Sequence, residues 1–281
     1  MAGLRYYLKK AEKEKWAMGQ FNFSNLKILE AIIRAAVKLK SPIILGTSEG
    51  ESKAIGLKKA VVLIEAYKKE TKLPIFLNLD HGKSFGYIKK AVDAGYEAVH
   101  FDGSGLPLKE NIKETKKIVK YAEKFGVLVV EGEVGVIGNV SKVKEISTDP
   151  QAAFKFVKET KVDSLAVAVG NLHGIRRSGI NPNLNLEKLK EIKKKTGIIP
   201  LVLHGGSGTL KKDIKEAIKL GIVKINVNTE LRMAYTNALK KSLKKSPKEI
   251  TPYKYISEAG AAVQKVVEEK IKIFGSSNKI C

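Results

Sequence analysis

Hydrophobic and polar positions follow two different periods along the chain. Short runs of mostly β-branched apolar residues alternate with longer stretches in which apolar residues recur every three or four positions. The short runs are predicted strands: residues 18–23, 42–47, 74–79, 98–102, 127–133, 163–169, 200–204 and 223–227. The longer stretches are predicted amphipathic helices, among them residues 26–40, 87–95, 110–126, 149–160, 185–197 and 210–221.

The order of these elements predicts the fold class. A strand followed by a helix, repeated from start to finish, is typical of parallel strands joined by helical crossovers. Eight such units fill the 281 residues, and no linker rich in Pro, Gly or Ser divides the chain. We therefore expect an α/β protein with one (β/α)8 barrel over residues 1–281, in preference to an open doubly wound sheet. Residues 254–274 would add a C-terminal helix.

Polar residues gather at the predicted strand ends, where barrels of this kind carry their chemistry. Every strand is followed by one polar group or pair: Asn22, Ser48, Asp80 with His81, Asp102, Glu133, His173, His204 and Asn226. Scattered polar residues are not expected to fall at all eight ends. The pattern indicates an enzyme.

Three of the four histidines lie at these ends, each beside a glycine, and they predict a metal site. Neutral imidazoles suit zinc, and a set of three ligands, His81, His173 and His204, leaves a coordination position for substrate. Cobalt, iron and manganese are alternatives. His100 lies two residues before Asp102 on the same strand face, so we expect it inside the barrel, one layer below the mouth, and not as a ligand.

Asp80 directly precedes a predicted metal ligand, His81. Within a regular strand the two side chains would face opposite ways, but at a strand end that turns through Gly82 both can reach the site. Asp80 is then a candidate general acid or base. The alternative is a carboxylate that only orients the ligand.

Two loops near the end of the chain are candidate phosphate sites. The segment HGGSG, residues 204–208, precedes a helix, and NVNT, residues 226–229, opens another. Glycines let backbone N–H groups approach a phosphate, and a helix N-terminus favours the negative charge. The last two loops of such barrels commonly bind phosphate. Arg177 could add a cation, and the alternative is a tight turn followed by a helix cap.

The chain is strongly basic, with 52 Lys and Arg against 29 Asp and Glu and a net charge of +23. Such a charge can indicate nucleic-acid binding. Here the lysines alternate with glutamates on outer helix faces, and there is no arginine stripe or zinc-finger pattern. We expect a solvated surface and no nucleic-acid partner.

The remaining composition predicts a cytoplasmic protein. No apolar run approaches the ~18 residues needed to span a membrane, so no membrane association is expected. Charged residues occupy the N-terminal positions where a signal peptide is apolar. The single cysteine, Cys281, excludes an internal disulfide and a thiolate metal cluster.

With these residues in place, the sequence resembles the class II fructose- and tagatose-bisphosphate aldolases over essentially its whole length. The matching segments are FNFSN (21–25), SEG (48–50), LNLDHG (77–82), FDGS (101–104), VEGEVG (130–135), AVAVGNLHG (166–174), LVLHGGSG (201–208) and KINVNTELR (224–232). Each is weak alone, but LDHG, GNLHG, LHGGSG and KINVNT in this order are highly specific together.

The resemblance implies a role for each matching residue. His81, His173 and His204 would bind a divalent metal, usually zinc, with Glu133 as a further metal carboxylate. Asp102 would lie near a secondary cation site, a monovalent cation being one candidate, and Asp80 would be the acid/base at the cleaved bond. Residues that would hold dihydroxyacetone phosphate are Gly174, Gly205, Gly206, Ser207, Asn226, Val227, Asn228 and Thr229. Ser48 would lie near the second half of a phosphorylated sugar. A homodimer or homotetramer is also implied.

Three departures from the family pattern affect these expectations. Arg177 stands where the family usually has Lys, and Asn228 stands where some relatives have Asp. The loop after Glu133 is short and basic and lacks the paired acids of relatives. Between Gly135 and Asp149, itself a predicted helix N-cap, the only acidic residue is Glu145. We hypothesise that Glu145 moves the proton at the carbon of dihydroxyacetone phosphate that forms the new bond; the alternative is a solvated surface glutamate.

Three other functions compete with this interpretation. A metal-free phosphate-binding isomerase or lyase explains the glycine loops but not three histidines at the mouth. A nucleic-acid-binding protein predicts strongly salt-dependent binding. A barrel with the same metal site could also catalyse a different retro-aldol reaction, and the substrate alternatives include tagatose as well as fructose bisphosphate.

Overall fold

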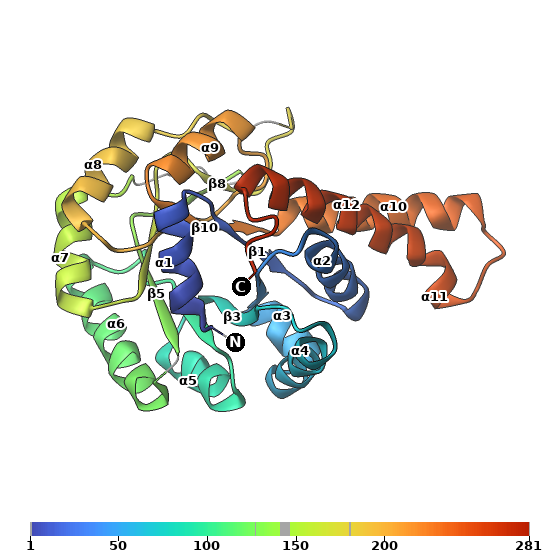
Figure 1. Cartoon of the computed structure of the whole chain (residues 1–281), viewed down its shortest axis with the longest axis horizontal. Coiled ribbons are helices and arrows are strands. Elements are labelled where there is room, and N and C mark those ends of the chain that lie inside the picture. Colours follow the sequence, from blue (N-terminus) through green and yellow to red (C-terminus); the bar gives the residue numbers. More distant parts are fainter. Residues whose placement is uncertain (1, 127, 141–146, 180, 281) are drawn as a thin grey trace.

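Eight parallel strands close into a barrel in the computed structural model, which describes residues 2–126, 128–140, 147–179 and 181–280 (Figure 1). The barrel strands are β1 (Met18–Asn22), β2 (Ile43–Ser48), β3 (Ile75–Gly82), β4 (Ala98–Phe101), β5 (Val129–Val134), β7 (Ser164–Val167), β9 (Leu201–Leu203) and β10 (Ile222–Val227). Their order around the barrel is β1-β10-β9-β7-β5-β4-β3-β2. Each coincides with a predicted run, and the expected (β/α)8 barrel is confirmed.

Helices surround the barrel on its outside. They are α2 (Leu26–Leu39), α3 (Glu49–Ile55), α4 (Leu57–Thr71), α5 (Phe85–Ala94), α6 (Leu108–Ala122), α7 (Pro150–Thr160), α8 (Leu186–Thr196) and α9 (Lys211–Lys219), with the short 3-10 helix η1 (Glu123–Phe125) after α6. Their apolar faces pack on the strands because apolar residues recur at helical spacing. The predicted cap Asp149 accepts a hydrogen bond from the Ala152 N–H at the start of α7.

Alternate strand residues point into the barrel and form three layers. The layer at the amino ends of the strands is apolar: Met18, Ile44, Phe76, Ala98 and Val129. The middle layer is polar and buried: Gln20, Asn78, His100, Glu131 and Lys224. The layer at the carboxyl ends carries the predicted site residues, including Asn22, Asp80, Glu133, His204 and Asn226. The polarity of the interior therefore changes along the barrel axis.

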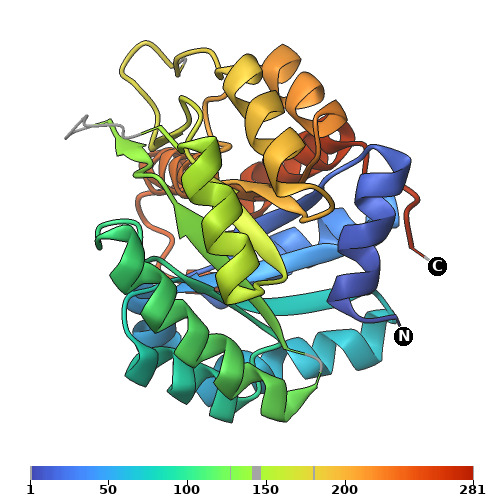
Figure 2. The same cartoon turned by 90° about the vertical axis from the view of Figure 1, so that its left-hand side faces the viewer.

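The helix α1 (Leu4–Glu14) closes the amino end of the barrel. Its residues Leu4, Tyr7, Leu8 and Ala11 are buried and form one apolar cluster with the first interior layer. In Figure 2 this helix lies at the right-hand side of the barrel, and residues 174–179 lie at the opposite, left-hand side. The site can therefore open only at the far end from α1.

Two long helices extend from the barrel at its C-terminal end. Helices α10 (Thr229–Lys245) and α12 (Ser257–Phe274) lie side by side and are joined through the short helix α11 (Pro252–Tyr255). In Figure 1 they project to the right, with α11 near the tip. Because α12 also packs on α2, it anchors the projecting pair to the barrel wall. It is the predicted C-terminal helix.

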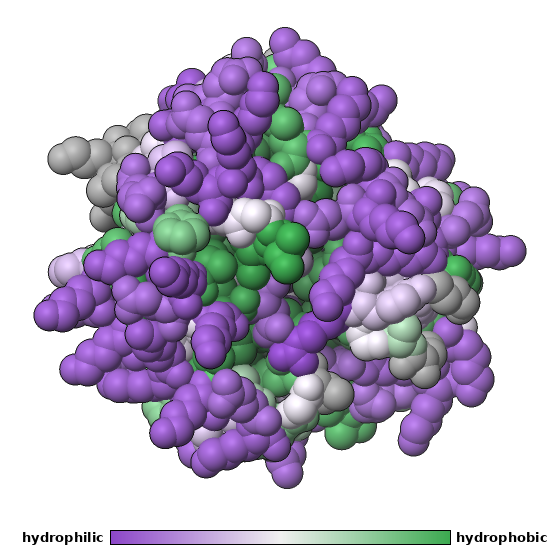
Figure 3. Space-filling model, turned by 60° about the vertical axis from the view of Figure 1, so that its left-hand side comes forward, coloured by the Kyte–Doolittle hydropathy of each residue, from purple (hydrophilic) through white to green (hydrophobic). Residues whose placement is uncertain are grey.

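The outer surface carries the charge of the chain. Hydrophilic side chains cover most of the face in Figure 3, and hydrophobic ones are visible mainly near its middle. Several exposed lysines pair with carboxylates three or four positions away, as Lys117 does with Glu114 and Lys89 with Asp93. No helix within the described ranges is long and apolar enough to cross a membrane.

Candidate active site

A cavity of about 430 Å³ opens at the carboxyl ends of the strands. It is lined by Ser48, Asp80, His81, Asn139, Val140, His173, Gly174, His204, Gly205, Ser207, Asn226, Asn228, Thr229 and Arg232. Most of the site residues expected from the sequence are therefore brought together. Asp102, Glu133, Arg177, Gly206 and Val227 do not line the cavity.

His81 and Asp80 both reach the site because the backbone of β3 is irregular. His81 has φ = 53°, in the left-handed region that non-glycine residues rarely adopt. The pairing of β3 with β4 shifts register between Leu79 and Gly82. The change in side-chain direction that lets both residues reach the site therefore occurs at His81, within the strand. The predicted turn through Gly82 is not where it occurs. Strained backbone of this type is common at functional sites.

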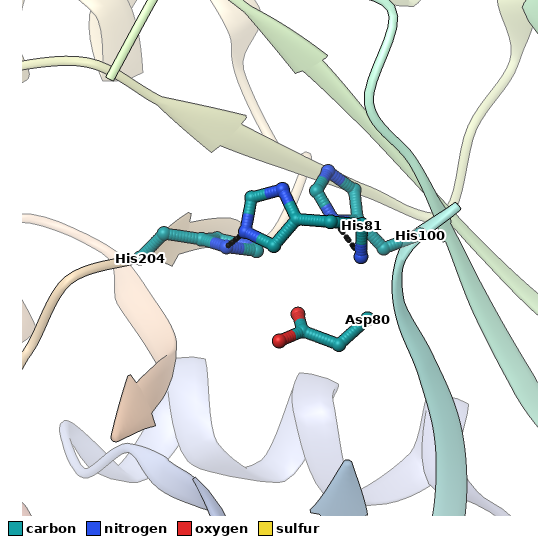
Figure 4. Close-up of side chains that lie close together, drawn as sticks. All are labelled: Asp80, His81, His100 and His204. Carbon is teal, nitrogen blue, oxygen red and sulfur yellow. Dashed lines mark hydrogen bonds between the residues drawn. The ribbon is translucent and has the colours of Figure 1, made fainter. Parts of the chain in front are cut away.

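The rings of His81 and His204 meet at the floor of the cavity. His81 Nε2 lies 3.0 Å from His204 Nδ1, and Figure 4 shows the His81 ring between those of His204 and His100, with the Asp80 carboxylate to one side. His81 Nδ1 is 3.0 Å from Asp102 Oδ2, and His204 Nε2 is 2.8 Å from Glu131 Oε1. A carboxylate only accepts hydrogen bonds, so each histidine carries a proton on the nitrogen facing its carboxylate. Their other nitrogens point at one another.

His173 is placed by two strands of two residues each at the mouth. Strand β8 (Leu172–His173) pairs with β6 (Gly138–Asn139), and the Val140 N–H donates to His173 O. The His173 ring lies 4.8 Å from the His81 ring and 6.2 Å from the His204 ring, measured between centroids. It borders the cavity, but it belongs to neither cluster of possible metal-ligand atoms among the described residues, which are Asp80, His81, His100 and His204, and His81, Asp102 and Glu133.

Asp80 is buried and fully engaged by amides. Its Oδ2 accepts a hydrogen bond from Asn22 Nδ2 and its Oδ1 accepts one from Asn226 Nδ2, both at 2.9 Å. Burial raises its pKa, but the positive charge of His81 and of the other nearby cations outweighs burial and holds the pKa well below its usual range. Asp80 is therefore an ionised, oriented carboxylate at neutral pH.

The three cavity histidines have very different proton affinities. Burial lowers the pKa of His173 and of His204 to about 4, so both rings are neutral at neutral pH. Burial also lowers the pKa of His81, but the surrounding carboxylates, first that of Asp80, raise it to about 9. In the metal-free protein His81 is consequently protonated, and its Nε2–H donates to His204 Nδ1.

His100 lies inside the barrel, next to His81, and is fully buried. Its Nδ1 accepts a hydrogen bond from the His81 N–H at 3.1 Å. Its Nε2 lies 3.2 Å from Glu133 Oε2, but the geometry of that contact is not that of a hydrogen bond. Asp102 binds Lys83 Nζ and Ser104 Oγ, each at 2.7 Å.

The loop after β9 lies against Leu172, the residue before His173. Gly205 has φ = 64°, and a Cβ on it would lie 2.2 Å from Leu172 O, so only glycine fits. The Gly206 N–H donates to Asn226 O, and the Gly208 N–H donates to Glu230 Oε1. These two amides are occupied within the protein. Ser207 and Gly205 remain on the cavity wall.

Arg177 and Glu145 were also expected at the site. Arg177 is exposed and does not border the cavity. Glu145 is outside the described residues. The arginine that lines the cavity within the described part of the chain is Arg232, whose Nη2 donates to Glu51 Oε1 at 2.5 Å. It lies one helical turn after Asn228, and that i, i+4 spacing could have indicated it from the sequence.

Comparisons with known proteins decide the family. The family model for class II fructose-bisphosphate aldolases matches residues 2–279. The chain belongs to this family. It is 41% identical over 279 positions to the probable fructose-bisphosphate aldolase of Bacillus subtilis, covering 97% of this chain and 96% of that protein. It is 40% identical over 286 positions to the fructose-bisphosphate aldolase of Geobacillus stearothermophilus, with 99% and 98% covered.

Solved structures agree with this class II aldolase assignment. The YdjI aldolase from Escherichia coli K12 matches with a TM-score of 0.83 and 33% identity, covering 99% of this chain and 98% of that one. A putative fructose-1,6-biphosphate aldolase from Coccidioides immitis matches with a TM-score of 0.84 and 27% identity, covering 98% and 97%. The predicted enzyme class, a carbon–carbon lyase, is confirmed.

The residues present fit the divalent metal on which this aldolase family depends. Two imidazole nitrogens, on His81 and His204, point at one another across 3.0 Å, and a proton joins them in the metal-free protein. Glu133 Oε2 and Asn226 Oδ1 are buried with no hydrogen-bond partner. Converging nitrogens beside unsatisfied buried oxygens are the donor set that a divalent cation takes.

Proposed function

We propose that this protein reversibly cleaves a ketose 1,6-bisphosphate to dihydroxyacetone phosphate and glyceraldehyde 3-phosphate with a divalent metal. Fructose 1,6-bisphosphate is the first candidate and tagatose 1,6-bisphosphate the alternative. The observation that carries the proposal is the meeting of His81 Nε2 and His204 Nδ1 beside the ionised Asp80, on the floor of a cavity large enough for a phosphorylated sugar.

The metal would be held by His81, His173 and His204. His173 and His204 are neutral, and His81 would lose its proton when the metal binds. Neutral imidazoles suit zinc, with cobalt, iron and manganese as alternatives. The ring of His173 is already beside that of His81. Glu133 would be a further metal carboxylate, and Asp102 would lie near a secondary, monovalent cation site. When bound, the metal supplies Lewis acidity toward the ketone of the substrate.

Asp80 would move the proton at the bond being cleaved. As an ionised carboxylate it takes the proton of the substrate hydroxyl, the C3–C4 bond breaks, and the aldehyde forms. In condensation it returns that proton. Asn22 and Asn226 hold its two oxygens, so its position is fixed before substrate arrives.

The loops at the mouth would hold the two phosphorylated halves. The dihydroxyacetone phosphate side would be formed by segments that contain Gly174, Gly205, Gly206, Ser207, Asn226, Val227, Asn228 and Thr229, of which Gly206 and Val227 lie behind the cavity wall. Arg177, expected as the added cation, is exposed outside the cavity, and Arg232 is the arginine on its wall. Helix α10 begins at Thr229 on the cavity wall and contributes its N-terminal polarity. Ser48 would contact the second half, on the side of the cavity formed by β2 and α3.

Glu145 would move the proton at the carbon of dihydroxyacetone phosphate that forms the new bond. It is the only acidic residue between Gly135 and Asp149. The alternative is a solvated surface residue. Hydrogen–deuterium exchange at dihydroxyacetone phosphate tests this: Glu145→Gln should slow the exchange strongly, and exchange at the parent rate would assign the proton transfer to another group.

We also propose a cytoplasmic homodimer or homotetramer. The projecting helices support an assembly, because Ile250 and Tyr253 at their far end are 87% and 70% exposed. Large apolar side chains exposed together are typical of protein interfaces. Analytical ultracentrifugation of the purified protein tests the assembly, and a monomer at micromolar concentration would contradict it.

Cleavage assays with both bisphosphates, with and without a chelator, test the proposed reaction. We expect turnover of fructose 1,6-bisphosphate, loss of turnover in chelator, and recovery when zinc or cobalt is added back. A preference for tagatose 1,6-bisphosphate would change the substrate but keep the reaction. Full turnover by protein shown to contain no metal, or turnover of neither sugar by metal-loaded protein, would contradict the proposal.

A further inference from the structure

A buried lysine lies directly below the candidate site. Lys224 comes from β10, its side chain is 4% exposed, and its Nζ donates to Glu131 Oε2 at 2.7 Å. The Glu131 carboxylate, from β5, is equally buried. Burying two charges costs free energy that their attraction often fails to offset. Packing alone therefore does not explain a charged lysine in the middle of the barrel.

Glu131 uses its two oxygens in different directions. Oε2 faces Lys224, with a long hydrogen bond of 3.5 Å from Ser164 Oγ, and Oε1 faces His204 Nε2 at 2.8 Å. The three side chains form one continuous row from the interior to the cavity floor. His204 is the last of them and presents Nδ1 toward His81.

This row dictates which nitrogen of His204 carries the proton. A carboxylate oxygen 2.8 Å from Nε2 requires an N–H there, so the lone pair of the neutral ring is on Nδ1. Without Lys224, the carboxylate would lose the partner that holds it in this orientation. The carboxylate could then rotate away from His204, and the ring could take the other tautomer or turn about its χ angles.

We propose that Lys224 is a positioning residue that acts through Glu131 to aim the Nδ1 lone pair of His204 at the divalent metal. This inference rests on the proposed metal site. Carboxylates that orient a histidine ligand typically change metal affinity by about 10–100-fold when removed. Here the lysine would orient that carboxylate in turn, one residue further from the metal.

Metal affinity of Lys224 variants tests the proposal directly. Metal-free protein is titrated with cobalt and zinc against a competing chelator, and the visible d–d spectrum of bound cobalt is recorded. We expect Lys224→Met to weaken binding about 10-fold or more and to shift the cobalt spectrum. Lys224→Arg, which keeps the charge, should recover part of the affinity. Parent-like affinity and spectrum in Lys224→Met would overturn the proposal.

A matched control separates positioning from the general loss of a buried ion pair. Lys270 is also buried, at 7% exposure, and its Nζ donates to Glu230 Oε1 at 2.8 Å. This ion pair does not contact His204. Lys270→Met should leave the cobalt spectrum and metal affinity unchanged. Equal effects of Lys224→Met and Lys270→Met would assign both to a general structural disturbance and would overturn the proposed row.

Nitrogen-15 NMR of the histidine rings tests the same point without any variant. In the parent protein, the ring of His204 should carry its proton on Nε2 and have an unprotonated Nδ1. A proton on Nδ1 with Nε2 unprotonated would overturn the proposal even if Lys224→Met does not fold. A different result would contradict the proposed metal site itself. In that case the parent protein would bind no stoichiometric metal, or His204→Ala would retain it.

Discussion

The two ends of the barrel are made from the same strands but have opposite chemistry. At the amino end, Phe76 and Val129 pack with α1 in a fully apolar cluster. At the carboxyl end, four residues further along the same strands, Asp80 and Glu133 lie among histidines and amides. Two residues separate each layer from the next, so these two strands pass from apolar to reactive within five positions.

The difference separates stability from function. The amino end removes apolar surface from water, which is the main favourable contribution to folding. The carboxyl end buries charges and holds His81 in a rare backbone conformation, both of which cost free energy. Changes at the first end should therefore alter stability and leave catalysis intact, and changes at the second should alter catalysis far more than stability.

The largest expected effect is the loss of a proposed metal ligand. His204→Ala should abolish both metal retention and turnover, because Nδ1 of His204 is one of the two converging nitrogens. Metal content by mass spectrometry and cleavage rate are measured together. The matched control is His100→Leu, an interior residue of the same barrel, which should keep its metal. Full activity in metal-stripped His204→Ala, or loss of metal from His100→Leu, would show that the ligand set is wrong.

The next effect is catalytic without loss of metal. Asp80→Asn keeps the shape of the side chain but removes the carboxylate, so cleavage should fall by ~10²–10⁴-fold. Metal content and binding of dihydroxyacetone phosphate should remain. If the variant instead loses its metal and the residual metal-bound fraction turns over at the parent rate, Asp80 orients a ligand and is not the acid/base.

At the amino end the expected effect is on stability alone. Leu8 of α1 is 2% exposed within the apolar cluster, and Leu8→Ala should lower the free energy of unfolding by about 2–5 kcal/mol. The turnover of the folded variant should match that of the parent. Val62→Ala on the exposed face of α4 is the control and should change stability by less than about 0.5 kcal/mol. A large change in turnover of folded Leu8→Ala would contradict the separation of the two ends.

The smallest expected effect is the pH dependence of stability in the metal-free protein. The pKa of His81 is raised to about 9, so its stabilising contribution is complete below about 6.5 and is lost as pH rises through 9. The pKa values of His173 and His204 are lowered to about 4, so the unfolded chain binds more protons between pH 6.5 and 4. Stability therefore falls in that window as pH decreases.

Thermal unfolding in chelator across pH 4–10 measures this dependence, and the melting temperature should be highest near neutral pH. His81→Asn should remove the alkaline decline, since asparagine tolerates a positive φ and does not titrate. An alkaline decline of parent size in that variant would assign it to another group.

The barrel could be predicted from the sequence because the spacing of apolar residues identifies each strand and helix. All eight strands match predicted runs, since each is an apolar segment bounded by polar turns. The position of the site followed from topology, because parallel strands present all their carboxyl ends at one mouth. Ser48 and Asn226, from strands far apart in the sequence, line the same cavity for this reason.

Other features depend on contacts that a single sequence does not state. Helix α1 was not predicted, since nothing in its composition shows that it closes the barrel. Arg177 was expected at the site, but it is exposed outside the cavity, and the arginine on the cavity wall is Arg232. The role of Lys224 is visible only when Glu131 of β5 is placed between it and His204.

The segment of residues 141–146 is bracketed by two anchors. On one side Val140 donates its N–H to His173 O, and on the other Thr148 exchanges hydrogen bonds with Ala168 and donates to Val134 O. The sequence between these anchors can therefore vary in length and chemistry while the flanking segments, one of which carries His173, stay in register. This makes positions 141–146 a natural graft point, where new sequence could be introduced, by evolution or by design, without rebuilding the candidate metal site.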